Sequence, residues 1–223
     1  MKTKTIRIVT ILIIILLASP LNVSAGSKEE KQNPSKSDTV KLFNGENLKN
    51  WEFQLKDTSV DPSTVFTVKN NVIHIKGDPF GYMRTKEIYS DYKLHVEWRW
   101  PEEATNSGVF IHGQLPDAIW LKCIECQLKA GSAGDFVCMN GADMKERTNK
   151  SASSVKKMAE SSEKPTGEWN SMDVICEGNS IEVYVNGVLQ NKGTEVTVNK
   201  GHICLQSEGK DIEFRNIFLT KLD

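Results

Sequence analysis

From residue 40 onward, apolar and polar residues alternate with a period of two along most of the chain. In the segment YKLHVEWRW (92–100), Tyr, Leu, Val and Trp occupy one set of alternate positions, and Lys, His, Glu and Arg occupy the other. The segment SIEVYV (180–185) alternates in the same way and is followed by Asn186-Gly187, a strong signal for a two-residue hairpin turn. Because successive residues of a strand point to opposite faces, this pattern predicts half-buried β-strands.

The same pattern recurs at 70–77 and 169–178, and twice within 201–222, where a turn is expected near Glu208 to Lys210. Helical periodicity is expected only at 151–160, as one or two turns inside a long polar loop (141–168). Short strands punctuated by Gly, Asn and Asp indicate an all-β fold. We therefore predict a two-sheet antiparallel β-sandwich, or jelly roll, over residues 39–223.

The N-terminal segment has the features of a secretory signal peptide. Lys2, Lys4 and Arg7 precede a short apolar run (8–18), and Val23-Ser24-Ala25 offers small residues for cleavage. The apolar run is short for a permanent membrane span, although an uncleaved anchor is the alternative. Residues 26–38 are polar and charged, which predicts a solvated linker. We predict a signal peptide (1–25), a linker (26–38) and a periplasmic or secreted domain that does not bind the membrane after cleavage.

The charge distribution bears on the partners of this domain. The chain has 28 basic and 29 acidic residues, and three of the basic ones lie in the predicted signal peptide. Basic residues form no stripe along any predicted strand. Nucleic acid is therefore not an expected partner.

Several predicted strands carry chemically active residues on their outward face. If these strands are neighbours, one sheet face gathers His, Arg, Glu and Gln, whose planar donors and acceptors suit a ligand rich in hydroxyl groups. The alternative is that these residues are solvated cross-strand pairs. The outward residues are His95, Glu97, Arg99, Phe110, His112, Cys123, Glu125, Gln127, Cys204 and Gln206, with Glu208 as a further candidate.

The C-x-x-C motif formed by Cys123 and Cys126 lies within one predicted strand. Residues three apart in a strand point to opposite faces and are too distant for a disulfide. No second ligand pair accompanies them, so we interpret the motif as incidental rather than as a zinc site. The five cysteines are an odd number, and a cross-strand Cys126–Cys138 disulfide is one possible pairing.

Blocks along the whole predicted domain resemble the bacterial 3-keto-disaccharide hydrolase domain family. They include VKLFNGENLKNWEF, GYMRTKEIYSDYKLHVEWRW, NSGVFIHG, IECQL, EWNSMDVICEGNSIEVYVNG and GHICLQSEGKDIEFRNIFLTKL, in the family's order. The resemblance implies a concanavalin-A-like fold and cleavage of glycosidic bonds in sugars oxidised to a ketone at C3. Position 112 departs from the family, which often has Arg there. The implied site residues are Arg99, His112, Glu125, Gln127, Gln206 and Arg215.

A C3 ketone acidifies the C2 proton, so the glycosidic bond can break by abstraction of that proton and loss of the C1 substituent. Water addition would complete a net hydrolysis. Such a site needs a base, an acid and donors for the enolate oxygen. We expect Glu125 or His112 to be the base, with Arg99 or Arg215 near the ketone oxygen. Gln127 stands where ordinary glucanases carry a second carboxylate, which argues against glucan hydrolysis.

The predicted loop 141–168 is expected to border the site, with Asp135 and Trp169 as substrate-binding residues at its rim. No cofactor is predicted from a motif. A divalent cation held by Glu125, His112 and Asp135 is an alternative for an enolising site. The alternative to an enzyme is a non-catalytic, lectin-like carbohydrate-binding module, because fold does not decide function.

Overall fold

A computed structural model describes residues 39–222; the predicted signal peptide and linker lie outside them. Nearly all regular structure is β, and every strand pairing is antiparallel, which confirms the predicted fold class. The first sheet, sheet A, has eight strands. In spatial order they are β13 (Val188–Gly193), β12 (Ser180–Val185), β11 (Asn170–Glu177), β6 (Tyr92–Arg99), β15 (Ile212–Lys221), β4 (Val72–Ile75) and β3 (Phe66–Lys69), with β1 (Thr39–Lys41) beside β15.

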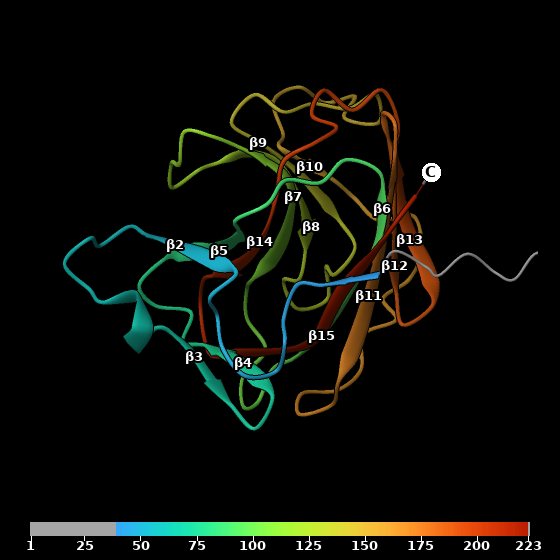
Figure 1. The fold of residues 1–223 in the computed structure, drawn as a ribbon. Coiled ribbons are helices and arrows are strands. Elements are labelled where there is room, and N and C mark those ends of the chain that lie inside the picture. Colours follow the sequence, from blue (N-terminus) through green and yellow to red (C-terminus); the bar gives the residue numbers. More distant parts are fainter. Residues whose placement is uncertain (1–38, 223) are drawn as a thin grey trace, which may run out of the picture. The chain divides into compact units, whose positions relative to one another are not determined.

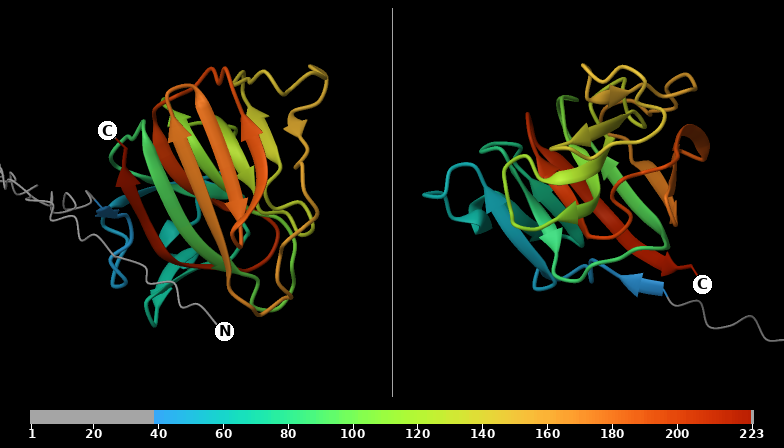
Figure 2. Two further views of the ribbon diagram at one scale, coloured as in Figure 1. Left: turned by 90° about the vertical axis from the view of Figure 1, so that its right-hand side faces the viewer. Right: turned by 90° about the horizontal axis from the view of Figure 1, so that it is seen from above.

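The second sheet, sheet B, has seven strands and forms the other layer of the sandwich (Figure 1, Figure 2). A short 3-10 helix, η1 (Pro62–Thr64), follows β2 (Trp51–Leu55) in the chain. In spatial order the strands of sheet B are β10 (Ser154–Val155), β9 (Phe136–Met139), β8 (Lys122–Gln127), β7 (Gly108–Gln114), β14 (His202–Ser207), β5 (Gly81–Thr85) and β2 (Trp51–Leu55).

The alternating residues of both sheets meet in one apolar core. In β6, Leu94, Val96 and Trp98 are fully buried, while the residues between them are half-buried or exposed. Ile124 of β8 and Leu205 of β14 join the same core from sheet B. The predicted inward faces of these strands are therefore confirmed. Each sheet also has an outer face, and the two outer faces lie on opposite sides of the core.

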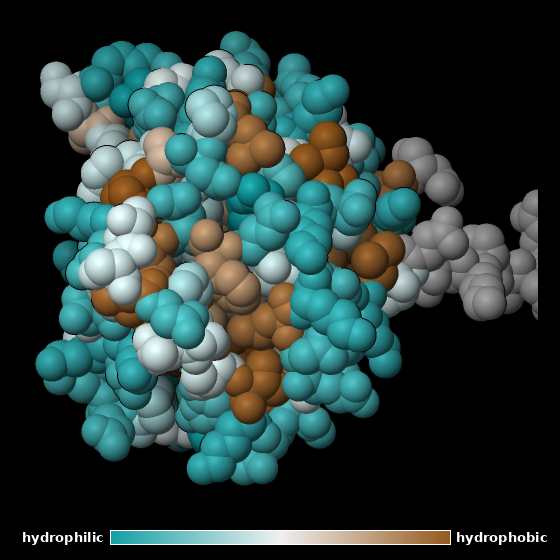
Figure 3. All heavy atoms as spheres, turned by 60° about the vertical axis from the view of Figure 1, so that its left-hand side comes forward, coloured by the Kyte–Doolittle hydropathy of each residue, from teal (hydrophilic) through white to brown (hydrophobic). Residues whose placement is uncertain are grey.

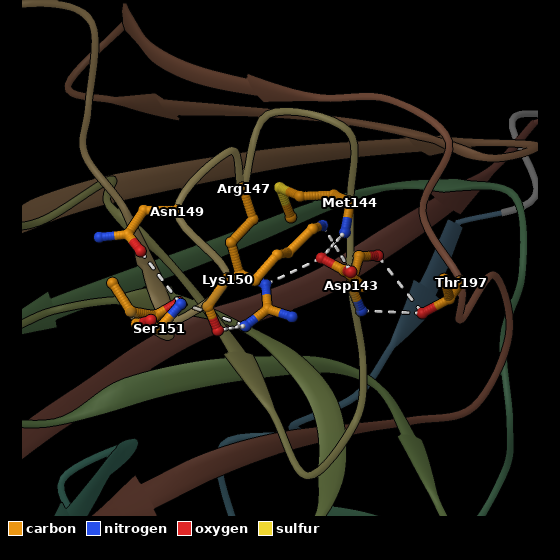
Figure 4. Close-up of polar contacts among 8 residues, drawn as sticks. Asp143, Met144, Arg147, Asn149, Lys150, Ser151 and Thr197 are labelled. Carbon is orange, nitrogen blue, oxygen red and sulfur yellow. Dashed lines mark hydrogen bonds and ion pairs between the residues drawn. The ribbon is translucent and has the colours of Figure 1, made fainter.

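The segment between β9 and β11 contains no helix, so the helical turns predicted at 151–160 are wrong. Polar anchors hold this segment in an irregular path. The Asp143 carboxylate accepts hydrogen bonds from Arg147 Nε at 2.8 Å and Lys150 Nζ at 2.6 Å, and its backbone N–H donates to Thr197 Oγ1 at 2.8 Å (Figure 4). Hydrogen bonds to side chains replace the backbone hydrogen bonds that a helix would form.

The five cysteines are all buried free thiols, so the possible Cys126–Cys138 disulfide is absent. Cys138 pairs across the strands with Ile124, whereas Cys126 pairs with Phe136. Cys123 and Cys126 lie in separate apolar clusters, which confirms that the C-x-x-C motif is part of a strand. Among residues 39–222, no helix is long and apolar enough to cross a membrane.

Candidate active site

Glu125 lies near the middle of sheet B, on its outer face. It pairs with Phe110 of β7 on one side and with Val137 of β9 on the other. Its carboxyl group lies directly over Gly108: a Cβ atom on residue 108 would collide with Glu125 Oε1. Glycine at 108 thus leaves the space that the carboxyl group occupies.

The surroundings of Glu125 oppose its negative charge. The residue is only 4% exposed, and its Oε1 atom is buried without a hydrogen-bond partner. Burial raises the pKa of Glu125 to about 8, and the nearby charge of Glu208 adds to this rise. The carboxyl group is therefore mostly protonated at neutral pH and can donate a proton.

Glu208 is the second carboxyl group of this part of the face. It follows the end of β14 and is half-buried, and burial raises its pKa above the ordinary value. Interactions with the amides of Asn106 and Gln206, and with the charge of Lys129, partly offset that rise. Glu208 is thus the group more easily ionised, and Glu125 the one more easily kept neutral. Two neighbouring carboxyl groups whose pKa values differ in this way can act as base and acid, here with Glu208 as the base and Glu125 as the acid.

The side-chain amides beside these carboxyl groups have unused hydrogen-bonding capacity. Gln206 is 1% exposed, and the buried side-chain oxygens of both Asn106 and Gln206 have no hydrogen-bond partner. Buried polar atoms are almost always paired in folded proteins, so such a group of unpaired atoms calls for an explanation. A site that meets a polar ligand provides one.

A cavity of about 230 Å³ opens beside Glu125, lined by Trp120, Glu125, Val137, Cys138, Met139, Asn140 and Ser153. Figure 3 brings forward the side of the molecule where β2 and β5 lie, and apolar side chains gather there between polar rims. Three hollows elsewhere are larger, at about 410, 440 and 320 Å³, but their ionisable side chains are exposed or half-buried. We therefore place the candidate site at the cavity that contains the buried carboxyl group.

The outer face of sheet B is less polar than predicted. Phe110, Cys123 and Cys204 form a second buried apolar cluster there, together with Leu121. The segment 115–121 covers part of this cluster. Asp117 in that segment binds the Arg84 guanidinium through two hydrogen bonds of 2.9 Å. On this face, Arg84 of β5 is paired with Asp117 and Glu52, and the buried polar atoms without partners are at β8, at the end of β14 and in the residues beside them.

His112 does not belong to the site, contrary to prediction. A β-bulge after Ile111 breaks the alternation, and His112 takes a left-handed conformation with φ of 56°. Its ring is turned toward Tyr92 of sheet A, with 5.6 Å between ring centroids. The ring nitrogens lie 3.0 Å from the Val198 carbonyl oxygen and 3.2 Å from that of Ser90. Burial lowers the pKa of His112, so the imidazole is a neutral structural contact rather than a catalytic base.

Arg99, Arg215 and Trp169 lie on sheet A, so the prediction that they share one face with Glu125 is wrong. The guanidinium carbons of Arg99 and Arg215 lie 4.8 and 4.0 Å from the centroid of the Trp169 ring. Arg99 also pairs with Glu213, and Arg215 pairs with Glu97 at 2.6 Å. These contacts hold the two guanidinium groups on the opposite exterior of the sandwich, where Trp169 and Arg215 line a hollow of about 320 Å³.

Gln127 and Asp135 are at the expected end of sheet B, but both have structural partners. Gln127 Oε1 accepts two backbone hydrogen bonds of 2.9 Å, from Leu128 and Lys129. Asp135 is 3% exposed and accepts hydrogen bonds from Lys156 Nζ at 2.9 Å and from the Lys157 backbone N–H at 2.8 Å. Asp135 therefore fastens the 141–168 segment instead of facing a ligand.

The cation site suggested by Glu125, His112 and Asp135 is not assembled, because His112 points toward sheet A and Asp135 is paired with Lys156. Within residues 39–222, no group of three His, Cys, Asp or Glu side chains is arranged to hold a metal ion. Of the predicted site residues, Glu125, Gln127 and Gln206 remain together on the outer face of sheet B.

Three contributors to the site were not among the predicted site residues: Asn106, Trp120 and Glu208. Glu208 continues the outward positions of β14 beyond Gln206, so strand alternation does place it on this face. Asn106 and Trp120 lie in connecting segments, to which alternation does not apply.

The family model of the 3-keto-alpha-glucoside-1,2-lyase-like domain matches residues 38–220. No curated protein matches the sequence. A candidate glycosyl hydrolase of known structure from Parabacteroides distasonis superposes with a TM-score of 0.62 at 18% identity, covering 83% of this chain and 94% of that one.

Two further solved structures show the same architecture at lower identity. A carbohydrate-binding module from Bacillus subtilis has a TM-score of 0.56 at 9% identity and covers 75% of this chain and 93% of its own. A β-glucanase from Bacillus licheniformis has a TM-score of 0.53 at 11% identity, with coverages of 84% and 98%. At these identities the likeness concerns the fold alone, which is the concanavalin-A-like sandwich.

Proposed function

The chain belongs to the 3-keto-alpha-glucoside-1,2-lyase-like domain family, and on this premise we propose that it cleaves the glycosidic bond of 3-keto-glycosides on the outer face of sheet B. The family match supports a carbohydrate-active protein. The observation that carries the proposal is the Glu125 carboxyl group, which is buried, unpaired and of raised pKa beside a cavity. Such perturbed groups in a cavity mark functional sites.

The proposed reaction is an elimination, in keeping with the lyase in the family's description. Ionised Glu208 removes the C2 proton, and the electron pair moves onto the C3 ketone oxygen as an enolate. The enolate then re-forms the ketone and expels the C1 substituent, whose oxygen takes the proton of Glu125. The products are an unsaturated keto-sugar and an alcohol, and addition of water at C1 would make the net result a hydrolysis.

The side-chain amides of Asn106 and Gln206 donate hydrogen bonds to Glu208, and each NH2 group has a second N–H. We assign these second N–H groups to the oxygens of the keto-sugar, because a developing enolate is stabilised by preorganised donors. This assignment replaces the predicted role of Arg99 and Arg215, which lie on the other sheet. It also gives the unpaired amide oxygens a partner in the sugar hydroxyl groups.

A non-catalytic carbohydrate-binding module is the competing interpretation. Binding alone does not need a carboxyl group that is held protonated near neutral pH, and burial of Glu125 opposes its ionisation throughout that range. Catalysis by proton transfer does need such a group, because its pKa must lie near the working pH. This observation favours the enzyme.

Replacing Glu125 by Gln tests the proposal. Gln has nearly the same shape but cannot donate the proton, so we expect kcat for a 3-keto-glucoside to fall by roughly 100-fold or more. The matched control is Glu97→Gln, which removes a carboxylate from the outer face of sheet A and should leave kcat within about twofold, the small change expected away from a site. Undiminished turnover by the Glu125 variant would remove this residue from the mechanism.

We further propose that the domain is exported to the periplasm or the exterior, on the basis of the predicted signal peptide. Cell fractionation followed by N-terminal mass analysis tests this. We expect the mature chain to begin at Gly26 and to be found outside the cytoplasm, and an intact Met1 in the cytoplasmic fraction would contradict the proposal.

A further inference from the structure

The two sides of Glu125 differ in polarity. Toward the end of β14 lie Asn106, Gln206 and Glu208, which offer amide and carboxyl groups. Toward β9 lie Val137 and the other apolar walls of the cavity. Glu125 therefore lies at the boundary between a polar half and an apolar half of the site.

The apolar half is walled on two sides. Val137 and Met139 form the side contributed by β9, and Met139 is 6% exposed. Trp120 forms the other side and remains 57% exposed. Phe80 packs against the Trp120 indole with 4.8 Å between ring centroids, so the indole is supported from outside the cavity. An exposed aromatic side chain held in this way is ready to pack against a ligand.

The size of the cavity limits what it can hold. Its volume is about 230 Å³, and a dry apolar cavity of about 150 Å³ already binds benzene. The cavity is thus suited to one ring. Apart from Glu125, its polar side chains are those of Asn140 and Ser153, which are exposed and lie at the rim. A sugar ring placed inside would leave most of its hydroxyl groups without partners, which costs free energy.

We propose that this cavity binds an apolar leaving group, so that the enzyme acts on 3-keto-glycosides whose aglycone is a single alicyclic or aromatic ring. The inference rests on the proposed function and adds the substrate class. The keto-sugar lies on the polar side, the glycosidic oxygen lies at Glu125, and the aglycone packs between Trp120 and Val137. Protonation of that oxygen by Glu125 releases the aglycone as an alcohol.

The test compares three 3-keto-glucosides that differ in the group attached to the glycosidic oxygen. These groups are ethyl, cyclohexylmethyl and a glucose joined through its C6 oxygen. All three leave as primary alcohols, so differences in leaving-group chemistry are small. We expect kcat/KM for the cyclohexylmethyl compound to exceed that for the ethyl compound by roughly 10- to 50-fold, as burial of one apolar ring predicts. The glucose-bearing compound should resemble the ethyl compound.

Trp120→Ala should remove most of this preference, because it deletes the apolar wall, so kcat/KM should fall several-fold more for the cyclohexylmethyl compound than for the ethyl compound. The matched control is Ile88→Ala, which removes an apolar side chain of similar exposure, 56%, from another hollow. That control should keep the full preference. The proposal would be overturned if kcat/KM were higher for the glucose-bearing compound than for the cyclohexylmethyl compound. It would also be overturned if Trp120→Ala lowered kcat/KM equally for all three substrates.

Calorimetry with the same compounds separates this proposal from the proposed function. If none of the three is cleaved, the proposed function fails. The cavity proposal then still predicts tighter binding of the cyclohexylmethyl compound than of the ethyl compound, and loss of that difference in Trp120→Ala. Equal affinities for both compounds in the unaltered protein would refute the cavity proposal by itself.

Discussion

The carboxyl groups of Glu125 and Glu208 have different surroundings, which suit Glu125 to act as the acid and Glu208 to act as the base. Glu125 is almost completely buried, lies over Gly108 and has an unpaired oxygen. Glu208 is half-buried and interacts with two amides and a lysine. Because the negative charge of Glu208 further disfavours ionisation of Glu125, the singly protonated pair is the form expected at neutral pH.

This arrangement predicts the pH dependence of kcat/KM for a 3-keto-glucoside. Glu125 acts while protonated and has a pKa of about 8, so kcat/KM should fall as the pH rises through that value. Glu208 acts while ionised and has a raised pKa, so kcat/KM should also fall at low pH, starting above the ordinary glutamate range near 4.5. Initial rates between pH 4 and pH 10 give the profile. A plateau that extends unchanged to pH 10 would show that no group of raised pKa acts as the acid.

The same pKa shift has a consequence for stability. The folded-state pKa of Glu125 is higher than that of the unfolded chain, so its stabilising contribution is complete below about pH 4.5 and is lost as the pH rises through about 8. Glu125→Gln cannot ionise, so its melting temperature should decline less between pH 6 and pH 9 than that of the unaltered protein. Thermal unfolding at both pH values measures this, and identical declines would contradict the raised pKa.

At the scale of elements, strands β7, β8 and β14 hold the site, and the connecting segments on either side of it are fastened by polar contacts. The segment between β9 and β11 is tied to Asp135 through Lys156 and Lys157. The bidentate contact of Arg84 with Asp117 ties the segment 115–121 to β5. These contacts keep Trp120 and the end of β9 in place as the walls of the cavity.

Asp135→Asn should loosen the segment around Lys157. The variant loses the charge that pairs with Lys156 and weakens the acceptor for the Lys157 backbone N–H, at a cost of about 1–3 kcal/mol for a buried polar group. Hydrogen exchange should become faster at 154–158, with little change in β6. A matched control is Asp143→Asn, whose partners Arg147 and Lys150 lie elsewhere in the segment. Equal exchange rates at 154–158 in the Asp135 variant and the unaltered protein would rule out this anchoring role.

The element scale also shows what the sequence could predict. Period-two alternation correctly separated Leu94, Val96 and Trp98 from the outward residues of β6, and Ile124 from Glu125 in β8. It failed at His112, because one extra residue in β7 reverses the alternation and a bulge has no reliable signal in a single sequence. Alternation also cannot tell which sheet a strand joins. Arg99 and Glu125 are both outward, but on opposite exteriors.

At the scale of the whole molecule, the two outer faces of the sandwich have different properties. The outer face of sheet A carries paired charges, in which Arg99 and Arg215 enclose Trp169 and bind Glu213 and Glu97. The outer face of sheet B carries unpaired buried polar atoms beside a cavity. Satisfied partners suit a structural surface, whereas unsatisfied ones suit a ligand site. The family resemblance correctly identified the family, but the sheet topology was needed to separate these two groups of residues.

Trp169→Ala tests this division. It removes two cation–π contacts and the packing around them, so we expect a loss of about 1–3 kcal/mol in the free energy of unfolding. KM and kcat for a 3-keto-glucoside should stay within about twofold, because the residue lies outside the proposed site. Denaturant titration and steady-state kinetics measure the two effects. A large rise in KM with unchanged stability would return Trp169 to the substrate site.

The central claim is that the keto-sugar binds on the outer face of sheet B with its glycosidic oxygen at residue 125. A crystal structure of Glu125→Gln soaked with an uncleaved 3-keto-glucoside tests it most directly. We predict sugar density over β7, β8 and β14, with C2 facing Glu208 and the C1 substituent directed toward Trp120. Sugar density against Trp169 and Arg215 on sheet A, with the face of sheet B empty, would contradict the account.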